Sequence, residues 1–100
     1  EAQQARGMMF RATLAPDAGM IFPMSPPRYA SFWMKNTVIP LDMIFIRADG
    51  RIARIAAETT PFSLLPVDSG EPVAAVLELA GGRAAQLGLA GGDKVVWKRR

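Results

Sequence analysis

The stretch SFWMKNTVIPLDMIFI, residues 31–46, decides the fold of this chain. Its second half leads into residues 41–47, which are apolar on both faces and therefore predict a strand in the middle of a sheet. Its first half belongs to a second predicted strand over residues 29–35. Between them, Asn36 and Thr37 predict a turn or bulge, because both residue types bond readily to the local backbone.

Downstream of this stretch, the dipeptide Asp49-Gly50 stands between two apolar runs and predicts a type I′ hairpin. The pairs expected across that hairpin are Ile46 with Ala53 and Ile44 with Ile55.

The remaining elements follow from local patterns of apolar residues, proline and glycine. We expect a helix over 1–10, a strand over 19–24, a loop over 25–28, a long surface loop over 57–72, a strand over 73–80, a helix over 81–89 that ends at Gly88, and a final strand over 91–98. Together these elements predict one mostly-β domain over residues 1–100, a small β-barrel or sandwich with one or two short helices.

The composition narrows the chemistry. Half of the 100 residues are hydrophobic, which is enough for one core, and the chain has no cysteine and no histidine. Disulfides, thiolate metal sites, cysteine nucleophiles and the commonest general base are therefore excluded. Paired carboxylates, a lysine or a hard metal held by carboxylates are the routes to catalysis that remain.

The net charge of +3 is accounted for by the three C-terminal residues, Lys98, Arg99 and Arg100. No stripe of arginine and lysine follows one predicted element, so we expect no nucleic-acid partner. The apolar run after Val38 is broken by Pro40 and Asp42 and is far shorter than the ~20 residues of a membrane span. We therefore expect no membrane-spanning segment.

Six motifs resemble, in the same order, a bacterial and archaeal family known as domain of unknown function 192. They are RGMMFR (6–11), GMIF (19–22), FWMKNT (32–37), IPLDMIFI (39–46), VLELAGG (76–82) and GDKV (92–95). The family usually has leucine at the position of Met8. The resemblance implies a β-rich fold with a helix near its N-terminus. Family members usually have a further strand ahead of that helix, just before the position of Glu1, and we expect residues 1–100 to lack it. The resemblance also implies a periplasmic or extracellular location, but no reaction.

The strongest candidate site lies within the opening stretch. Trp33 and Lys35 share one face of the predicted strand, about 7 Å apart. A flat aromatic ring beside an ammonium group suits a small polar ligand such as a carbohydrate, and Asn36, Thr37 and Asp42 can add hydrogen bonds. In the alternative interpretation, the same polar residues only bond the turn, Asp42 accepts its amide protons, and Trp33 is part of the core.

Glu78 is the second candidate, because it shares an apolar face of its predicted strand with Val76 and neighbouring alanines. A carboxylate on such a face needs a partner, since an unpaired buried charge is very costly. The candidate partners are Arg6, Arg11 and Lys35. Glu78 then either supports a polar pocket or forms one internal ion pair. A third interpretation pairs it with Asp42 as the two carboxylates of a hydrolase.

Three functional hypotheses follow. The leading one is a non-catalytic binding domain for a small polar ligand, with a pocket near residues 33–42. The alternative is a structural or interaction module in which the same residues hold the fold, and the third is the carboxylate-based hydrolase. We predict no catalytic residue, cofactor or metal, and we interpret the methionines as core filler. The sequence indicates no particular protein partner.

Overall fold

The part of the chain that the structure describes forms two antiparallel β-sheets and one short helix. The structure is a computed structural model, and it describes residues 19–32, 34 and 39–95. The elements are listed in chain order: β1 (Gly19–Arg28), β2 (Ser31–Phe32), β3 (Leu41–Ile46), β4 (Ile52–Ala56), β5 (Val67–Asp68), β6 (Val73–Ala80) and α2 (Arg83–Gln86).

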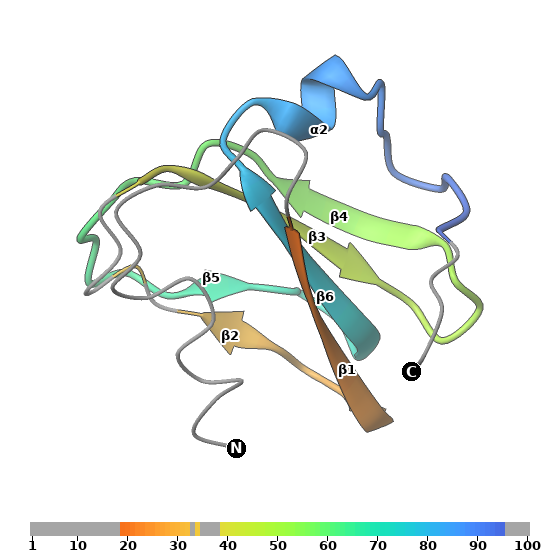
Figure 1. The fold of residues 1–100 in the computed structure, drawn as a ribbon. Helices are drawn as coiled ribbons and strands as arrows, with labels where there is room; N and C mark the ends of the chain where they lie inside the picture. The colour runs from red at the N-terminus through yellow and green to blue at the C-terminus, as the bar shows by residue number, and fades with distance from the viewer. Residues whose placement is uncertain (1–18, 33, 35–38, 96–100) are drawn as a thin grey trace.

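The larger sheet has four strands in the order β1-β6-β3-β4, and β2 pairs with β5 in a second, two-stranded sheet. Figure 1 shows α2 and the two-stranded sheet on opposite sides of the larger sheet. The sheets are open within the described residues, so the mostly-β prediction is confirmed in its sandwich form rather than as a closed barrel. The predicted central strand is also confirmed, because β3 lies between β6 and β4 and all its residues are buried.

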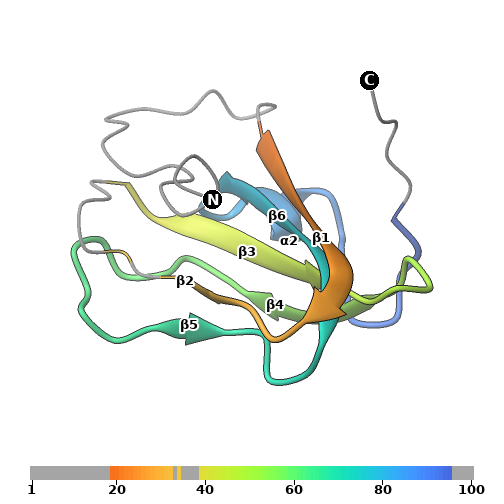
Figure 2. The ribbon, with the colours of Figure 1, turned by 90° about the horizontal axis from the view of Figure 1, so that it is seen from below.

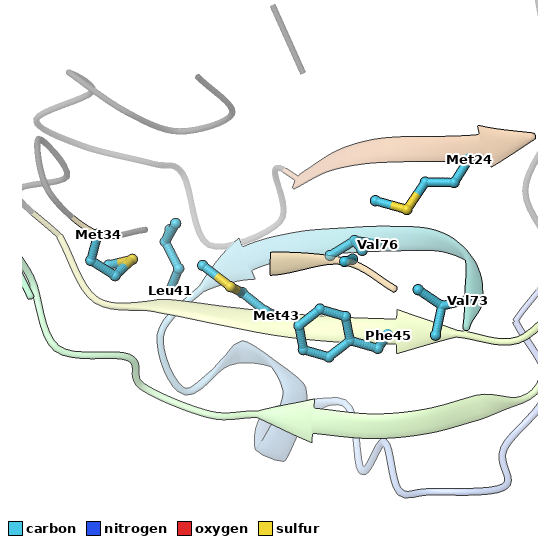
Figure 3. Packing of buried hydrophobic residues seen from close by; sticks show 8 residues of the cluster. Met24, Met34, Leu41, Met43, Phe45, Val73 and Val76 are labelled. Atoms are coloured by element: carbon cyan, nitrogen blue, oxygen red, sulfur yellow. The ribbon is translucent and has the colours of Figure 1, made fainter. Parts of the chain in front are cut away.

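Two apolar clusters cover the two faces of the larger sheet. Alternation along β3 sends Met43 and Phe45 into the cluster that includes Val76 and partly buried residues of β2 and β5, so this cluster fills the space between the two sheets. Figure 3 shows the side chains of this cluster packed together. Ile44 and Ile46 enter the other cluster, which lies against α2. The prediction that methionine fills the core is confirmed for Met24, Met34 and Met43.

The hairpin between β3 and β4 does not form by the predicted turn. A type I′ turn needs a positive φ at both central residues, whereas of Asp49 and Gly50 only Gly50 has one, at 85°. The Gly50 N–H donates to the Arg47 carbonyl at 2.9 Å, and the Arg47 N–H donates to the Arg51 carbonyl at 2.8 Å. The connection is therefore a three-residue loop closed by a left-handed glycine.

This longer loop changes the register of the hairpin. Ile44 pairs with Ile55 as predicted, but Ile46 pairs with Ile52, and the predicted pair of Ile46 with Ala53 is wrong. A register shift between Phe45 and Ile46 places an additional residue in β4, which is a β-bulge.

The loop predicted over residues 25–28 is part of β1 instead. β1 is an edge strand, where proline is tolerated because one side of the backbone needs no partner in the sheet. Its pairing with β6 breaks after Pro23 and resumes at Arg28 opposite Val73, so residues 24–27 form an irregularity within the strand.

The other predicted elements are found in shorter form. The strand over 73–80 is confirmed as β6. Of the residues described within 29–35, Ser31 and Phe32 form a strand, β2. The helix over 81–89 is reduced to α2, followed by Gly88 at a φ of 68°. The predicted final strand appears in the described residues as one bridge between Arg51 and Lys94. The predicted helix over 1–10 lies outside the described residues.

Candidate functional site

Asp42 is the member of the predicted pocket whose position is described, and its carboxylate is fully buried in β3. Its Oδ1 accepts the N–H of Glu58 at 2.8 Å and the N–H of Gly82 at 3.1 Å, while its Oδ2 accepts the N–H of Ala84 at 2.7 Å. Gly82 is the N-cap residue of α2, and as a glycine it has no side chain to cap the helix. Asp42 therefore supplies the cap from a different element.

The turn from β6 into α2 places the N–H groups of Gly82 and Ala84 against the carboxylate of Asp42. The Gly81 N–H donates to the Pro40 carbonyl at 3.0 Å, which holds the turn against the start of β3. A β-carbon at Gly81 would lie 2.9 Å from Pro40 Cβ, and Gly82 has a left-handed φ of 89°. Two glycines are therefore required where the helix begins.

The sheet register separates the two acidic residues of the predicted hydrolase. β3 and β6 pair Asp42 with Leu79 and Met43 with Glu78. Paired residues share a face and consecutive residues alternate, so Asp42 and Glu78 point to opposite faces of the sheet. Glu78 is buried, at 2% exposure, on the face between the two sheets. The two carboxylates cannot flank one scissile bond, and a pocket formed jointly by them is equally excluded.

Most of the other predicted site residues are not described by the structure. They are Trp33, Lys35, Asn36, Thr37, Arg6 and Arg11, all of which lie outside the described residues. Met34, between Trp33 and Lys35 in the sequence, is described and is completely buried.

A groove lies beside Met34, where β4, the loop after it and β5 meet. Its volume is about 540 Å³, and it is lined by Met34, Arg54, Ile55, Ala56, Ala57, Thr59, Thr60, Ser63, Leu65, Pro66, Val67 and Asp68. We call it the edge groove, because residues 54–56 of β4, the last strand in the order of the larger sheet, line it. Figure 2 shows the loop that joins β4 to β5.

Hydrogen bonds fix the walls of the edge groove. The Arg54 guanidinium donates to the Asp68 carbonyl and so links β4 to β5. Thr59 Oγ1 donates to the Leu41 carbonyl at 2.9 Å, accepts the Leu41 N–H at 3.3 Å, and lies 3.3 Å from the sulfur of Met34. The groove thus offers a guanidinium and hydroxyl groups on a wall that is already ordered.

An ion pair between two described residues lies away from the edge groove. Arg47 Nε donates to Glu71 Oε1 at 2.8 Å, and both side chains are about 40% exposed, at 40% and 41%. The hydrogen bond from Arg47 lowers the pKa of Glu71 below its ordinary value of 4.5, and the same bond raises the pKa of Arg47. Such an exposed pair orients the end of β3 and contributes little stability.

Sequence reasoning missed most of the residues that line the edge groove. It predicted a surface loop over 57–72, but it gave no role to Arg54, Thr60 or Ser63. The clustering of threonine and serine in that loop was the available signal, since loops on a rigid scaffold often carry binding residues. Among the described residues, no three or more acidic side chains gather as a metal site would require, and no helix there has the length and apolar character needed to cross a membrane.

Comparison with known proteins gives the family but no activity. A crystal structure of a protein of unknown function from Novosphingobium aromaticivorans DSM 12444 is similar at 52% identity and a TM-score of 0.92, over 96% of this chain and 69% of that one. A second, from Sinorhizobium meliloti 1021 and provisionally called a transcription regulator, has 46% identity and a TM-score of 0.88, over 93% of this chain and 72% of that one. Curated proteins give no significant match.

The family model described as Uncharacterized ACR, the model of domain of unknown function 192 (DUF192), matches residues 1–97. That match covers nearly the whole chain and agrees with the motifs and with the β-rich sandwich. The chain therefore belongs to the DUF192 family.

Proposed function

We propose that this chain is a non-catalytic binding domain that takes a small polar ligand in the edge groove. The observation that carries the proposal is a groove of about 540 Å³ beside Met34. That volume lies within the range of about 300–1,000 Å³ typical of small-molecule sites. Met34 also ties the groove to the sequence stretch in which Trp33 and Lys35 were predicted to bind.

The chemistry of the walls supports a polar ligand. Arg54 offers guanidinium donors, and Thr60 and Ser63 offer hydroxyl groups that both donate and accept. Leu65 and Pro66, which are exposed, add apolar surface on which a ligand can pack. A few polar groups around an apolar floor are the usual composition of a binding site.

The proposal is non-catalytic because the acidic pair predicted for hydrolysis is split between two faces of the sheet. Asp42 is further occupied by three backbone N–H groups, which is the behaviour of a structural carboxylate.

The test is a titration of isotope-labelled protein followed by amide NMR shifts. The probes are glucose, galactose, N-acetylglucosamine, glycine and glutamate, each at millimolar concentration. We expect at least one probe to shift amides of residues 54–68, and Arg54→Met to weaken that binding. Arg28→Met is the matched control, because Arg28 is an exposed arginine on β1 outside the groove. If no probe shifts groove amides, or if both variants bind alike, the proposal is wrong.

A structural or interaction module is the second candidate, and the network around Asp42 favours it. In that case Asp42→Ala and Lys35→Ala lower the stability of the domain and leave all binding unchanged. Chemical unfolding of both variants, together with the same titration, separates the two candidates.

We also propose that the protein acts in the periplasm or outside the cell, as the family resemblance suggests. A fusion of the complete natural gene to alkaline phosphatase, which is active only after export, tests this location. A DNA duplex is added to the titration because one relative is called a transcription regulator. We expect no binding to it, since no predicted element carries a stripe of arginine and lysine.

A further inference from the structure

The charged groups that line the edge groove do not neutralise each other. Arg54 and Asp68 are the charged residues among the described residues that line it. The guanidinium of Arg54 donates to the backbone carbonyl of Asp68, which is an uncharged acceptor. Among the described residues, Arg54 forms no ion pair with Asp68 or with any other acidic side chain. The groove therefore contains a cation that no described carboxylate contacts.

The sheet geometry explains why Arg54 reaches the carbonyl of Asp68 and not its carboxylate. Arg54 is paired with Phe45, which belongs to the apolar cluster between the two sheets, so Arg54 lies on that face of β4. Val67 of β5 packs against the same cluster. Because consecutive strand residues alternate, the side chain of Asp68 lies on the opposite face of β5. The guanidinium therefore meets the backbone of β5 only.

Most of the hydrogen-bonding capacity of Arg54 remains available for a ligand. A guanidinium has five N–H donors, and the bond to the Asp68 carbonyl is made by one nitrogen, Nη1. The side chain is exposed at the groove, so the other donors are open to solvent. The bond to Asp68 also restrains the side chain before a ligand arrives, which lowers the entropy lost on binding.

Two hydroxyl groups add donors to the same groove. Ser63 Oγ accepts the N–H of Leu65 at 3.1 Å, which leaves its O–H free to donate. The hydroxyl of Thr60 is hydrogen-bonded to none of the described residues, and Thr60 is exposed. Thr59 differs, because its hydroxyl is already bonded to the backbone of Leu41. The groove therefore offers one positive charge and several donors, which together favour a ligand with a negative charge and oxygen acceptors.

We propose that the ligand of the edge groove is a small carboxylic acid, bound through its carboxylate to Arg54. This inference rests on the proposed function and narrows the small polar ligand to one chemical class. The two oxygens of a carboxylate match the fork of a guanidinium, and such charge-assisted bonds are stronger than neutral ones. One guanidinium balances the single charge of a carboxylate, whereas a phosphate ester carries about −1.5 to −2 at pH 7.

The remainder of the acid is expected to lie against the apolar part of the wall. Leu65 and Pro66 line the groove, and both are exposed. Covering them with the carbon skeleton of the acid removes apolar surface from water. An acid with a branched carbon chain or a sugar ring should therefore bind more tightly than acetate.

The experiment extends the NMR titration with three pairs of probes, in which a carboxylate is compared with its uncharged amide. The pairs are acetate and acetamide, isovalerate and isovaleramide, and glucuronate and glucuronamide. Dissociation constants are measured from the amide shifts of residues 54–68 for the wild type, Arg54→Gln and the matched control Arg28→Gln. The dispersion of the amide spectrum establishes that each variant is folded. The comparison of acid with amide in the wild type needs no variant, so it tests the inference even if Arg54→Gln unfolds.

We expect the acid of at least one pair to bind the wild type about tenfold more tightly than its amide, because only the acid makes charge-assisted bonds. In Arg54→Gln the acid should bind within about twofold of the amide, since glutamine carries no charge. Arg28→Gln should retain the tenfold difference, because Arg28 lies on β1 outside the groove.

Equal affinities of acid and amide in every pair overturn the inference, and so does a tenfold difference that persists in Arg54→Gln. Uncharged sugars that shift the groove amides while no acid does so would overturn it and leave the proposed function standing. Inorganic phosphate is titrated as well, and if it binds the groove in place of every acid, the carboxylate is the wrong anion. If none of the probes shifts residues 54–68, both proposals are wrong.

Discussion

Replacing Asp42 should strongly destabilise the domain. The carboxylate is fully buried and accepts three backbone N–H groups, of which the N–H of Ala84 is itself buried. Leaving a buried donor without a partner costs about 1–3 kcal/mol, and the bonds from Glu58 and Gly82 contribute about 1 kcal/mol each because water can partly replace the acceptor. We therefore expect Asp42→Ala to lower the free energy of unfolding by about 4 kcal/mol.

That loss is a large fraction of the ~5–15 kcal/mol typical of a domain, so a milder variant is needed as well. Asp42→Asn keeps one carbonyl oxygen as an acceptor but turns an NH₂ group toward at least one N–H. We expect it to cost about 2 kcal/mol. Asp93→Asn is the matched control, because Asp93 Oδ2 accepts one exposed N–H, from Ala90, at 2.8 Å. The control should change the stability by less than about 1 kcal/mol.

The assay is unfolding in urea followed by circular dichroism, with amide hydrogen exchange as a local readout. In Asp42→Asn, the amide of Ala84 should lose protection while the amides of β3 and β6 retain theirs, because the helix start loosens before the sheet does. A cost below about 1 kcal/mol for Asp42→Ala, or equal costs for Asp42→Asn and Asp93→Asn, would refute the role that we assign to this carboxylate.

Three further predictions concern other parts of the molecule. The hydrogen bond from Arg47 lowers the pKa of Glu71 in the folded state, so the stabilisation is present above the ordinary pKa of 4.5 and is lost as the pH falls through the lowered value. Glu71→Gln should therefore lower the unfolding temperature at neutral pH in low salt and leave it unchanged in strong acid, as measured by thermal unfolding across pH. An equal loss at neutral pH and in strong acid would contradict a stabilising ion pair between Arg47 and Glu71. Gly81→Ala should lower the free energy of unfolding by about 2 kcal/mol, because the new Cβ would lie 2.9 Å from Pro40 Cβ. An unchanged midpoint of urea unfolding would show that this close contact does not destabilise the fold. Leu65→Ser should change the unfolding free energy by less than about 0.5 kcal/mol, since the leucine is 78% exposed, and it should weaken any small probe that binds the edge groove in the NMR titration.

The strands of the large sheet were predictable from residue types. Residues 41–47 and 73–80 are apolar runs of strand length between turn residues, and they form β3 and β6 at the centre of the sheet. Burial of both faces is what such runs require, so the local pattern and the final position agree. The mostly-β fold class follows from the same observation.

The connections were less predictable, because several backbone solutions fit the same residue types. Asp49-Gly50 correctly predicted a hairpin and the pair of Ile44 with Ile55. The choice of a three-residue loop with a β-bulge moved Ile46 opposite Ile52, and that choice depends on how β4 packs rather than on the turn residues alone. In β1, prolines predicted a loop, but an edge strand tolerates them.

The sequence by itself determined the family, the β-rich fold class and the central place of β3. Only the tertiary structure decided what Asp42 does and where a ligand can lie. The amides bound by Asp42 come from Glu58, Gly82 and Ala84, and the edge groove joins Met34 to residues 54–68. Partners this distant along the chain leave no local signal, because strand pairing, and not residue spacing, brings them together.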